Sequence, residues 1–263
     1  MYRKPNAPLS VGGVIQEAIR LYRESFRRCL PITVLGAAVS AAFDLLILGY
    51  AHHAGMTLTG PEQILEVYEQ PPIMALSLLY AVLQLAVLGA LLVMQNAVAN
   101  RDTLLRAAQA INIGFARLGR CVIAAVVSTV LIVLGCFLVL PGLYLSGALA
   151  LWPVALYVEN AHGLQSLDVS RKLIYGYWWH ASSVLGVALL GALAFSMVAG
   201  FIAAVIGTVL GTDAAGLGLG ELISAVADVF MLPMVPVSLI ALYNDLQQRR
   251  SGVDAERRAG GAS

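Results

Sequence analysis

Six stretches of this chain are apolar and nearly uncharged over a length that can cross a lipid bilayer. A spanning helix needs about 20 largely apolar residues, because each residue adds about 1.5 Å and the hydrocarbon layer is about 30 Å thick. Charged residues make up 12% of the chain, whereas a soluble domain carries about a quarter. We therefore predict an all-α membrane protein with one polytopic domain over residues 1–246. Its six transmembrane helices are expected at residues 30–50, 73–99, 121–140, 143–158, 177–209 and 222–243. Only Pro141 and Gly142 separate the third from the fourth, so we expect these two residues to form the turn of a tight helical hairpin.

The lysine and arginine residues favour one orientation of these six spans. All 16 of them lie in segments 1–28, 100–120, 159–176 and 244–263, which a six-span arrangement places on one side. The connections on the other side contain none. Basic residues are retained on the cytoplasmic side of a membrane. The pattern predicts a multi-pass protein with both termini in the cytoplasm, ending in a charged tail over residues 247–263 that we expect to be disordered.

The chain begins with an amphipathic segment, SVGGVIQEAIRLYRESFRR, at residues 10–28. Its apolar residues recur with the spacing of one helix face. Ser10 is expected to cap its start, and Pro31 is expected in the first turn of the next helix. Such a helix lies in the membrane plane with its basic side toward anionic headgroups. The expected headgroup or partner contacts on it are Arg20, Arg23, Arg27 and Arg28.

Two later segments repeat this arrangement. Residues 103–117 and 163–176 are also amphipathic, and each precedes a pair of spans. We therefore expect three cytoplasmic-side amphipathic interfacial helices and a threefold repeat of one surface helix plus two spans. Internal repeats are common in transporter folds. They also arise in proteins with no transport role, so the repeat leaves the function open.

Three segments resemble a known family. They are LSVGGVIQEAIRLYRESFRRCLPI at the start, LWPVALYVENAHGLQSLDVSRKLIYGYWW at residues 151–179, and ALYNDLQQRRSGVDAE at residues 241–256. These segments are similar to YciC-type inner-membrane proteins and to the membrane domain attached to some glycerophosphoryl diester phosphodiesterases. The resemblance implies a helical integral protein of the bacterial inner membrane, connected with envelope or lipid metabolism. It does not imply phosphodiesterase activity, because the chain has no room for the soluble catalytic barrel of those enzymes.

Two acidic residues fall inside expected spans. Asp44 and Asp228 each lie about 9 Å below the outer end of a span, counted at about 1.5 Å per residue. Intramembrane carboxylates are costly and are often functional. Because no lysine or arginine lies on that side, each acid is expected to be protonated, hydrated or paired with a cation. His52 and His53 are the titratable candidates for that cation. One reading is a proton or cation site; the other is two acids near the interface that reach water or a neighbouring helix.

The sixth span also contains two prolines, Pro233 and Pro236. Each proline removes a backbone donor and clashes with the preceding turn, so we expect a kink with its freed carbonyls turned to a neighbour or a cavity. Broken helices frame transporter sites, but proline kinks also occur in purely structural spans. Asp228 precedes the two prolines by one to two turns.

Glu159 follows the fourth span, and Arg171 and Lys172 follow about a dozen residues later. We expect a local ion pair among them, or alternatively a site for a polar headgroup or a partner. No serine, histidine and aspartate set suggests catalysis. The three cysteines and the His52–His53 pair suggest packing residues and a solvated loop, not a metal site. We expect no enzyme, no cofactor, no metal and no nucleic-acid partner.

The sequence therefore supports two functional hypotheses. The first is a non-enzymatic scaffold or accessory protein that acts through anionic membrane lipids, a protein partner or a second copy of itself. The second is a carrier or channel for an ion, lipid or small solute that uses Asp44 and Asp228. Neither the substrate nor the oligomeric state follows from the residues.

Overall fold

The computed structural model describes residues 7–56, 61–210 and 214–260, and within these ranges the chain forms helices and connecting turns without strands. Six segments are long and apolar enough to span a membrane, which confirms the predicted all-helical, multi-span architecture. The helices are α1 (Val11–His53), α2 (Pro61–Tyr68), α3 (Pro71–Ala99), α4 (Ala107–Ala116), α5 (Leu118–Cys136), α6 (Leu140–Ala148), α7 (Trp152–Tyr157), α8 (Gly163–Ile174), α9 (Trp178–Leu210), α10 (Ala214–Met231) and α11 (Met234–Gly260).

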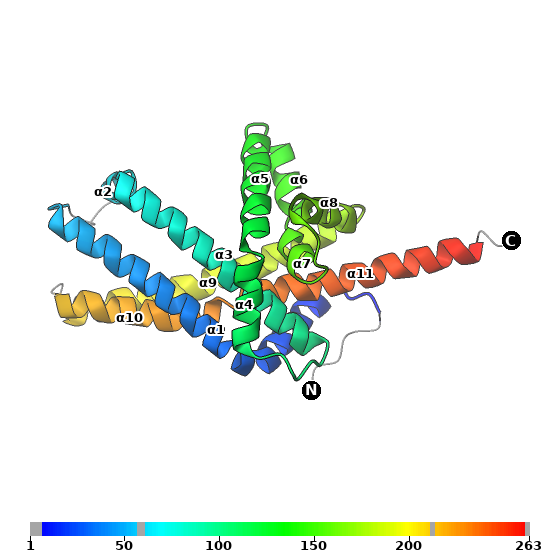
Figure 1. The fold of residues 1–263 in the computed structure, drawn as a ribbon, viewed down its shortest axis with the longest axis horizontal. Helices are drawn as coiled ribbons and strands as arrows, with labels where there is room; N and C mark the ends of the chain where they lie inside the picture. Colours follow the sequence, from blue (N-terminus) through cyan, green and yellow to red (C-terminus); the bar gives the residue numbers. More distant parts are fainter. Residues whose placement is uncertain (1–6, 57–60, 211–213, 261–263) are drawn as a thin grey trace.

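Four long helices form a bundle, and a hairpin projects from it (Figure 1). α1 packs against α3 and α10, and α10 packs against α9. The far ends of these four helices lie together, at the left of Figure 1, where α2 also lies. The α5–α6 hairpin runs transverse to the bundle, and α11 extends to the opposite end. The six apolar segments are therefore not parallel to one another.

The opening amphipathic segment and the first span form one helix of 43 residues. Ser10 caps it as predicted, since its side chain accepts a hydrogen bond from the Gly13 N–H at 3.2 Å. The prediction that Pro31 begins a separate helix was wrong, because Pro31 lies inside α1. A proline in a helix interior bends the axis without always ending the helix. α1 changes direction along its first half, so the amphipathic segment and the span still point differently (Figure 1).

The second amphipathic segment is shorter than predicted. We expected a helix over residues 103–117, but α4 covers only Ala107–Ala116. α4 packs closely against α3, because a Cβ atom on Gly114 would lie 2.5 Å from the Ala86 carbonyl oxygen. Small residues allow such close helix crossings, which stabilise helix pairs in a membrane. α8 (Gly163–Ile174) agrees with the third predicted segment to within two residues.

The predicted third and fourth spans differ most from the structure. α5 ends at Cys136, and the turn consists of residues 137–139, not of Pro141 and Gly142, which lie in the first turn of α6. The expected span at residues 143–158 is interrupted, since α6 ends at Ala148 and α7 begins at Trp152. Proline at the start of a helix is favourable. Pro141 and Pro153 each stand in the first turn of such a short helix.

The sixth span is broken at the predicted position. α10 ends at Met231 and α11 begins at Met234, so Pro233 lies in the break and Pro236 in the first turn of α11. α11 then continues to Gly260. The expected disorder of residues 247–263 was therefore wrong for the part that α11 covers; residues 261–263 lie outside the described ranges.

The core lies where the first half of α1, the end of α3, α7, the start of α9 and α11 meet. Leu21, Leu92, Leu151, Leu242 and Leu246 are fully buried there. In lipid the hydrophobic effect does not drive helix pairing, so close packing and interhelical hydrogen bonds supply the stability. The candidate sites lie around this junction.

Candidate functional site

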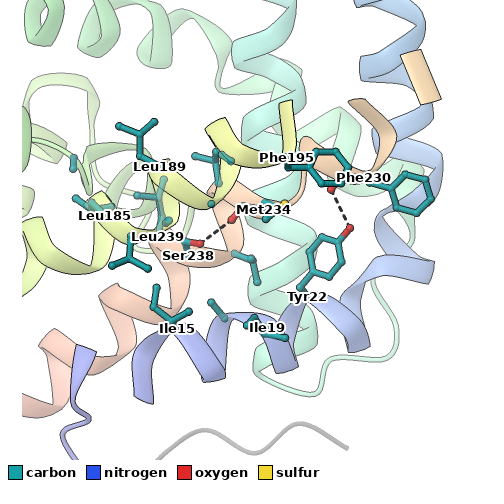
Figure 2. Close-up of a pocket in the computed structure, with 18 of the residues that line it drawn as sticks. Ile15, Ile19, Tyr22, Leu185, Leu189, Phe195, Phe230, Met234, Ser238 and Leu239 are labelled. Carbon is teal, nitrogen blue, oxygen red and sulfur yellow. Dashed lines mark hydrogen bonds between the residues drawn. The ribbon is translucent and has the colours of Figure 1, made fainter. Parts of the chain in front are cut away.

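An apolar cavity of about 760 Å³ lies between the first half of α1, the middle of α9 and the α10–α11 break. Its side chains come from helices that are distant in sequence, as Figure 2 shows for Ile15 and Ile19 on α1 and Leu185 and Leu189 on α9. Ligand sites in proteins measure about 300–1,000 Å³ and are mostly apolar. The cavity has the size and the lining of a site for an apolar ligand.

The polar groups in the cavity wall differ in whether they are free to contact a ligand. The Tyr22 hydroxyl donates to the Phe230 carbonyl at 2.9 Å, and Ser238 donates to the Met234 carbonyl at 2.9 Å (Figure 2). Both hydroxyl protons are thus used within the protein. Arg23 also lines the cavity and is exposed, and no carboxylate of the described ranges lies within ion-pair distance of it. The guanidinium of Arg23 is the charged group that this cavity offers to a ligand.

The structure brings Asp44 and Asp228 together. Asp44 on α1 lies within electrostatic range of Asp228 on α10, and Ser40 of α1 lies near Asp228. Ser40 also shares a hydrogen bond with the Tyr80 hydroxyl at 3.2 Å and accepts one from Gln84 at 3.0 Å. The two acids that the sequence singled out therefore belong to one polar cluster between α1, α3 and α10. Within the part of the chain that the structure describes, His52 and His53 form no ion pair with either acid.

A second cavity of about 430 Å³ adjoins this cluster. The polar residues that line it are Asp228, Gln84 and Ser196 of α9, and the rest of the lining consists of apolar residues of α3 and of the α10–α11 break. Val235 lines both cavities, so the break separates them. Gln95 of α3 donates to the Pro233 carbonyl at 2.9 Å, and this carbonyl also accepts from the Val237 N–H at 3.3 Å, so α3 is joined to the α10–α11 break.

The predicted headgroup residues do not act as one group. Arg20 pairs with Glu17 at 3.9 Å, and Arg27 is exposed. Arg28 donates to the Asp102 carbonyl at 2.7 Å and so ties α1 to the connection between α3 and α4. Of the four arginines predicted on this segment, Arg23 is the one that lines the apolar cavity.

The predicted ion pair of Glu159 with Arg171 and Lys172 was wrong. Lys172 and Arg171 pair with Asp168 at 2.6 Å and 3.8 Å, one turn away on the same helix. Residues three or four apart on a helix are neighbours, so Arg171 and Lys172 pair with Asp168 on their own helix and not with Glu159. Glu159 instead accepts a hydrogen bond from the Tyr243 hydroxyl of α11. Glu159 therefore joins the connection after α7 to α11.

Sequence reasoning missed a buried carboxylate, Asp245. Its Oδ1 accepts from the Leu9 N–H at 2.6 Å, and its Oδ2 contacts His180 Nε2 at 2.9 Å and Arg249 Nε at 2.8 Å. Arg249 also donates to the Leu9 carbonyl and lies 5.7 Å from the centre of the Tyr177 ring. This cluster fastens the start of the chain and α9 to α11. Asp245 lies just past the expected sixth span, where a carboxylate is expected to be exposed to water and its burial is not indicated by the sequence.

Two groups outside the apolar segments have perturbed acidities. The hydrogen bond from Lys172 holds the pKa of Asp168 below its usual value. Desolvation opposes this, and the charges of Lys172 and Arg171 lower the pKa further. Burial raises the pKa of Tyr68 on α2, and the nearby carboxylate of Asp44 raises it further. The pKa of Tyr68, which lies outside the span, is therefore expected to depend on the charge of Asp44.

Comparisons of the chain with protein-family models, curated protein sequences and solved structures found no match. The resemblance to YciC-type proteins therefore stays a prediction from the quoted motifs. The fold defines a class all the same: six apolar helical segments of spanning length are the architecture of a multi-pass membrane protein.

Proposed function

We propose that this protein is a non-enzymatic integral membrane protein that acts through a bound anionic lipid, as an accessory protein in envelope or lipid processes of a bacterial inner membrane. The observation that carries the proposal is the apolar cavity of about 760 Å³ with the exposed Arg23 in its wall. The acyl chain would occupy the cavity between α1 and α9, and the headgroup would lie against the guanidinium.

The position of Arg23 supports an anionic lipid over a neutral one. Arg23 lies two turns after Ile15 and one turn after Ile19, on the face of α1 that lines the cavity. A helix of this kind rests at the boundary between acyl chains and headgroups. Its basic residue then stands beside the headgroup, where one charge contributes about 1 kcal/mol of attraction to anionic lipid.

The test is to extract the protein into native lipid nanodiscs and to identify the retained lipids by mass spectrometry. A Gly191→Phe variant should displace the lipid, because Gly191 lines the cavity and has open space at its Cβ position. Gly200→Phe is the matched control, since Gly200 has the same open space on the same helix but does not line the cavity. Equal lipid retention in both variants would refute the proposed cavity occupant.

The charge of Arg23 is tested separately. Arg23→Gln should weaken retention of anionic lipid about fivefold, the equivalent of about 1 kcal/mol, and should leave neutral lipid unchanged. Arg27→Gln is the control, because Arg27 is exposed one turn later on α1 and lies outside the cavity lining. A stoichiometric protein partner in the nanodiscs, without retained lipid, would favour a protein-binding scaffold instead.

A carrier is the second candidate. It is favoured because Asp44 lies within electrostatic range of Asp228, which lines the second cavity. A proton-coupled or cation-coupled carrier uses intramembrane acids of this kind. The double variant Asp44→Asn and Asp228→Asn should insert normally yet lose activity in a transport or growth assay. Wild-type activity of the double variant would exclude this candidate.

A further inference from the structure

The α5–α6 hairpin ends in an apolar tip that the rest of the molecule does not cover. No charged residue lies between Arg120 and Glu159 in the sequence. At the tip, Phe137, Leu138, Val139 and Leu140 are each between 71% and 81% exposed. A connection that emerges into water normally carries polar residues, because water must hydrate it. This tip presents four large hydrocarbon side chains in succession.

The N–H groups of the tip donate to carbonyls of the same turn. The Leu138 and Val139 N–H groups donate to the carbonyls of Gly135 and Cys136 at 3.0 Å, and Leu140 donates to Leu138 at 2.7 Å. Unsatisfied backbone groups cost several kcal/mol in lipid, so non-helical chain there must pair internally. A turn with its amide groups paired in this way suits surroundings without water.

The two helices of the hairpin are in close contact at the turn. A Cβ atom on Gly142 would lie 2.6 Å from the Cys136 nitrogen, and one on Gly135 would lie 2.9 Å from Gly142. These glycines let the chain reverse in a narrow turn, which leaves no room for water between its arms.

An aromatic cluster fixes how far the tip extends from the start of α9. Trp178 donates from its indole N–H to the Tyr144 carbonyl at 3.0 Å, and the two rings lie 6.0 Å apart. Trp179 packs edge-on against Trp178 and is itself exposed. Tryptophan and tyrosine gather at the level of the headgroups. The cluster at the start of α9 therefore marks one membrane interface.

The tip cannot reach the other interface from there. Leu138 precedes Tyr144 by six residues, which span about 9 Å as a helix and at most about 20 Å when fully extended. The hydrocarbon layer is about 30 Å thick. By contrast, α3 with 29 residues and α9 with 33 residues are about 44 Å and 50 Å long. α5, at 19 residues and about 28 Å, must then be inclined, and Figure 1 shows the hairpin transverse to the bundle.

We propose that the α5–α6 hairpin enters the leaflet on the side of the chain termini and turns inside the hydrocarbon, without crossing it. Its binding partner is the acyl region of that leaflet. α1, α3, α9 and the α10–α11 pair make the crossings. The distribution of lysine and arginine does not distinguish this arrangement from six spans, because both ends of the hairpin return to the same side either way. This inference goes beyond the proposed function and does not depend on what fills the cavity.

Cys136 is a natural probe for the depth of the tip. It is exposed, whereas Cys29 and Cys121 are buried, so a nitroxide reagent should label it selectively. The experiment uses the full-length protein in liposomes, with Cys136→Ala as the background. Electron paramagnetic resonance compares collisions with oxygen, which concentrates in hydrocarbon, and with a polar nickel chelate, which stays in water.

The expected result is high access to oxygen and loss of access to the nickel chelate. The reference for a water-exposed position is a nitroxide on Glu66→Cys in the Cys136→Ala background, on α2 at the far end of the bundle. Nickel access at Cys136 equal to that at Glu66→Cys would overturn the proposal in favour of a crossing hairpin. Low access to both reagents with an immobile nitroxide would overturn it in favour of a contact with a second copy.

A charge at the tip gives an independent readout. Leu138→Lys should reduce the membrane-inserted yield if the tip lies in hydrocarbon, whereas Leu138→Met, with a similar volume, should not. A lysine variant that inserts and unfolds at the wild-type temperature would contradict a buried tip, since a charge inside the membrane is costly.

Discussion

The Asp245 cluster supports a quantitative prediction for the variant Asp245→Asn. Asparagine keeps the shape of the side chain but replaces one carboxylate oxygen with an N–H donor. Oδ1 can still accept from the Leu9 N–H, whereas the new donor would face Arg249 Nε, which is also a donor, at 2.8 Å. The substitution therefore removes one charge-assisted bond and leaves the Arg249 guanidinium beside a neutral group.

The cost follows from the burial of the pair. The Asp245 side chain is 1% exposed and that of Arg249 is 21% exposed. Breaking a buried ion pair costs about 3–5 kcal/mol, and a hydrogen bond to a charged group contributes about 1.5–3 kcal/mol. Because water still reaches Arg249, we expect Asp245→Asn to lower the free energy of unfolding by about 3 kcal/mol, the lower end of the range for a buried ion pair. For a chain of this size the unfolding temperature should fall by about 6–12 °C.

The assay is thermal unfolding in nanodiscs of one lipid composition, combined with limited proteolysis. Cleavage near Leu9 should become faster than in the wild type, because Asp245 and Arg249 hold that residue from both sides. Asp168→Asn is the matched control, since its carboxylate pairs with Lys172 on the exposed face of one helix. If Asp245→Asn lowers the unfolding temperature no more than the control, the cluster does not stabilise the fold as we describe.

Three further predictions test other parts of the structure. Asp44→Asn should lower the pKa of Tyr68 without restoring its ordinary value, because burial remains; ring-labelled NMR titration measures this. The folded pKa of Asp168 lies below its unfolded value of about 3.9, so its contribution to stability is full above that value and is lost as the pH falls through the folded pKa. Acid unfolding of wild type and Asp168→Asn should therefore differ near neutral pH and converge at the acid end. Gly114→Val should destabilise the protein by about 1–3 kcal/mol in thermal unfolding, because its Cβ would meet a backbone carbonyl of α3 at 2.5 Å.

Much of the helical layout could be predicted from local signals. The expected span at residues 177–209 agrees with α9, and the two prolines correctly indicated the break between α10 and α11. The predicted helix boundaries were wrong where tertiary packing overrides the local conformational preference of proline and glycine. Pro31 was expected to begin a helix, yet α1 continues through it. Pro141 and Gly142 were expected to form the turn, yet close contact of the two glycines moves the turn to residues 137–139.

The candidate sites could be predicted only in part. The cost of acids in lipid singled out Asp44 and Asp228, but their closeness depends on the packing of α1 against α10. The apolar cavity left no signal, because its walls come from four helices whose apolar residues look alike in sequence. The contacts of Asp245 were equally invisible, since Leu9 and His180 lie 236 and 65 residues away.

The sequence by itself determined that this chain forms long helices of spanning length, with its basic residues gathered in four segments. Length, hydropathy and charge are properties of each stretch alone, so they can be determined without knowing which other segments it contacts. The tertiary structure decided which helices meet, where the cavities open, which arginine faces one of them and how far the hairpin tip extends. These depend on shape complementarity between distant segments, such as Gly114 of α4 against Ala86 of α3, which no single stretch encodes.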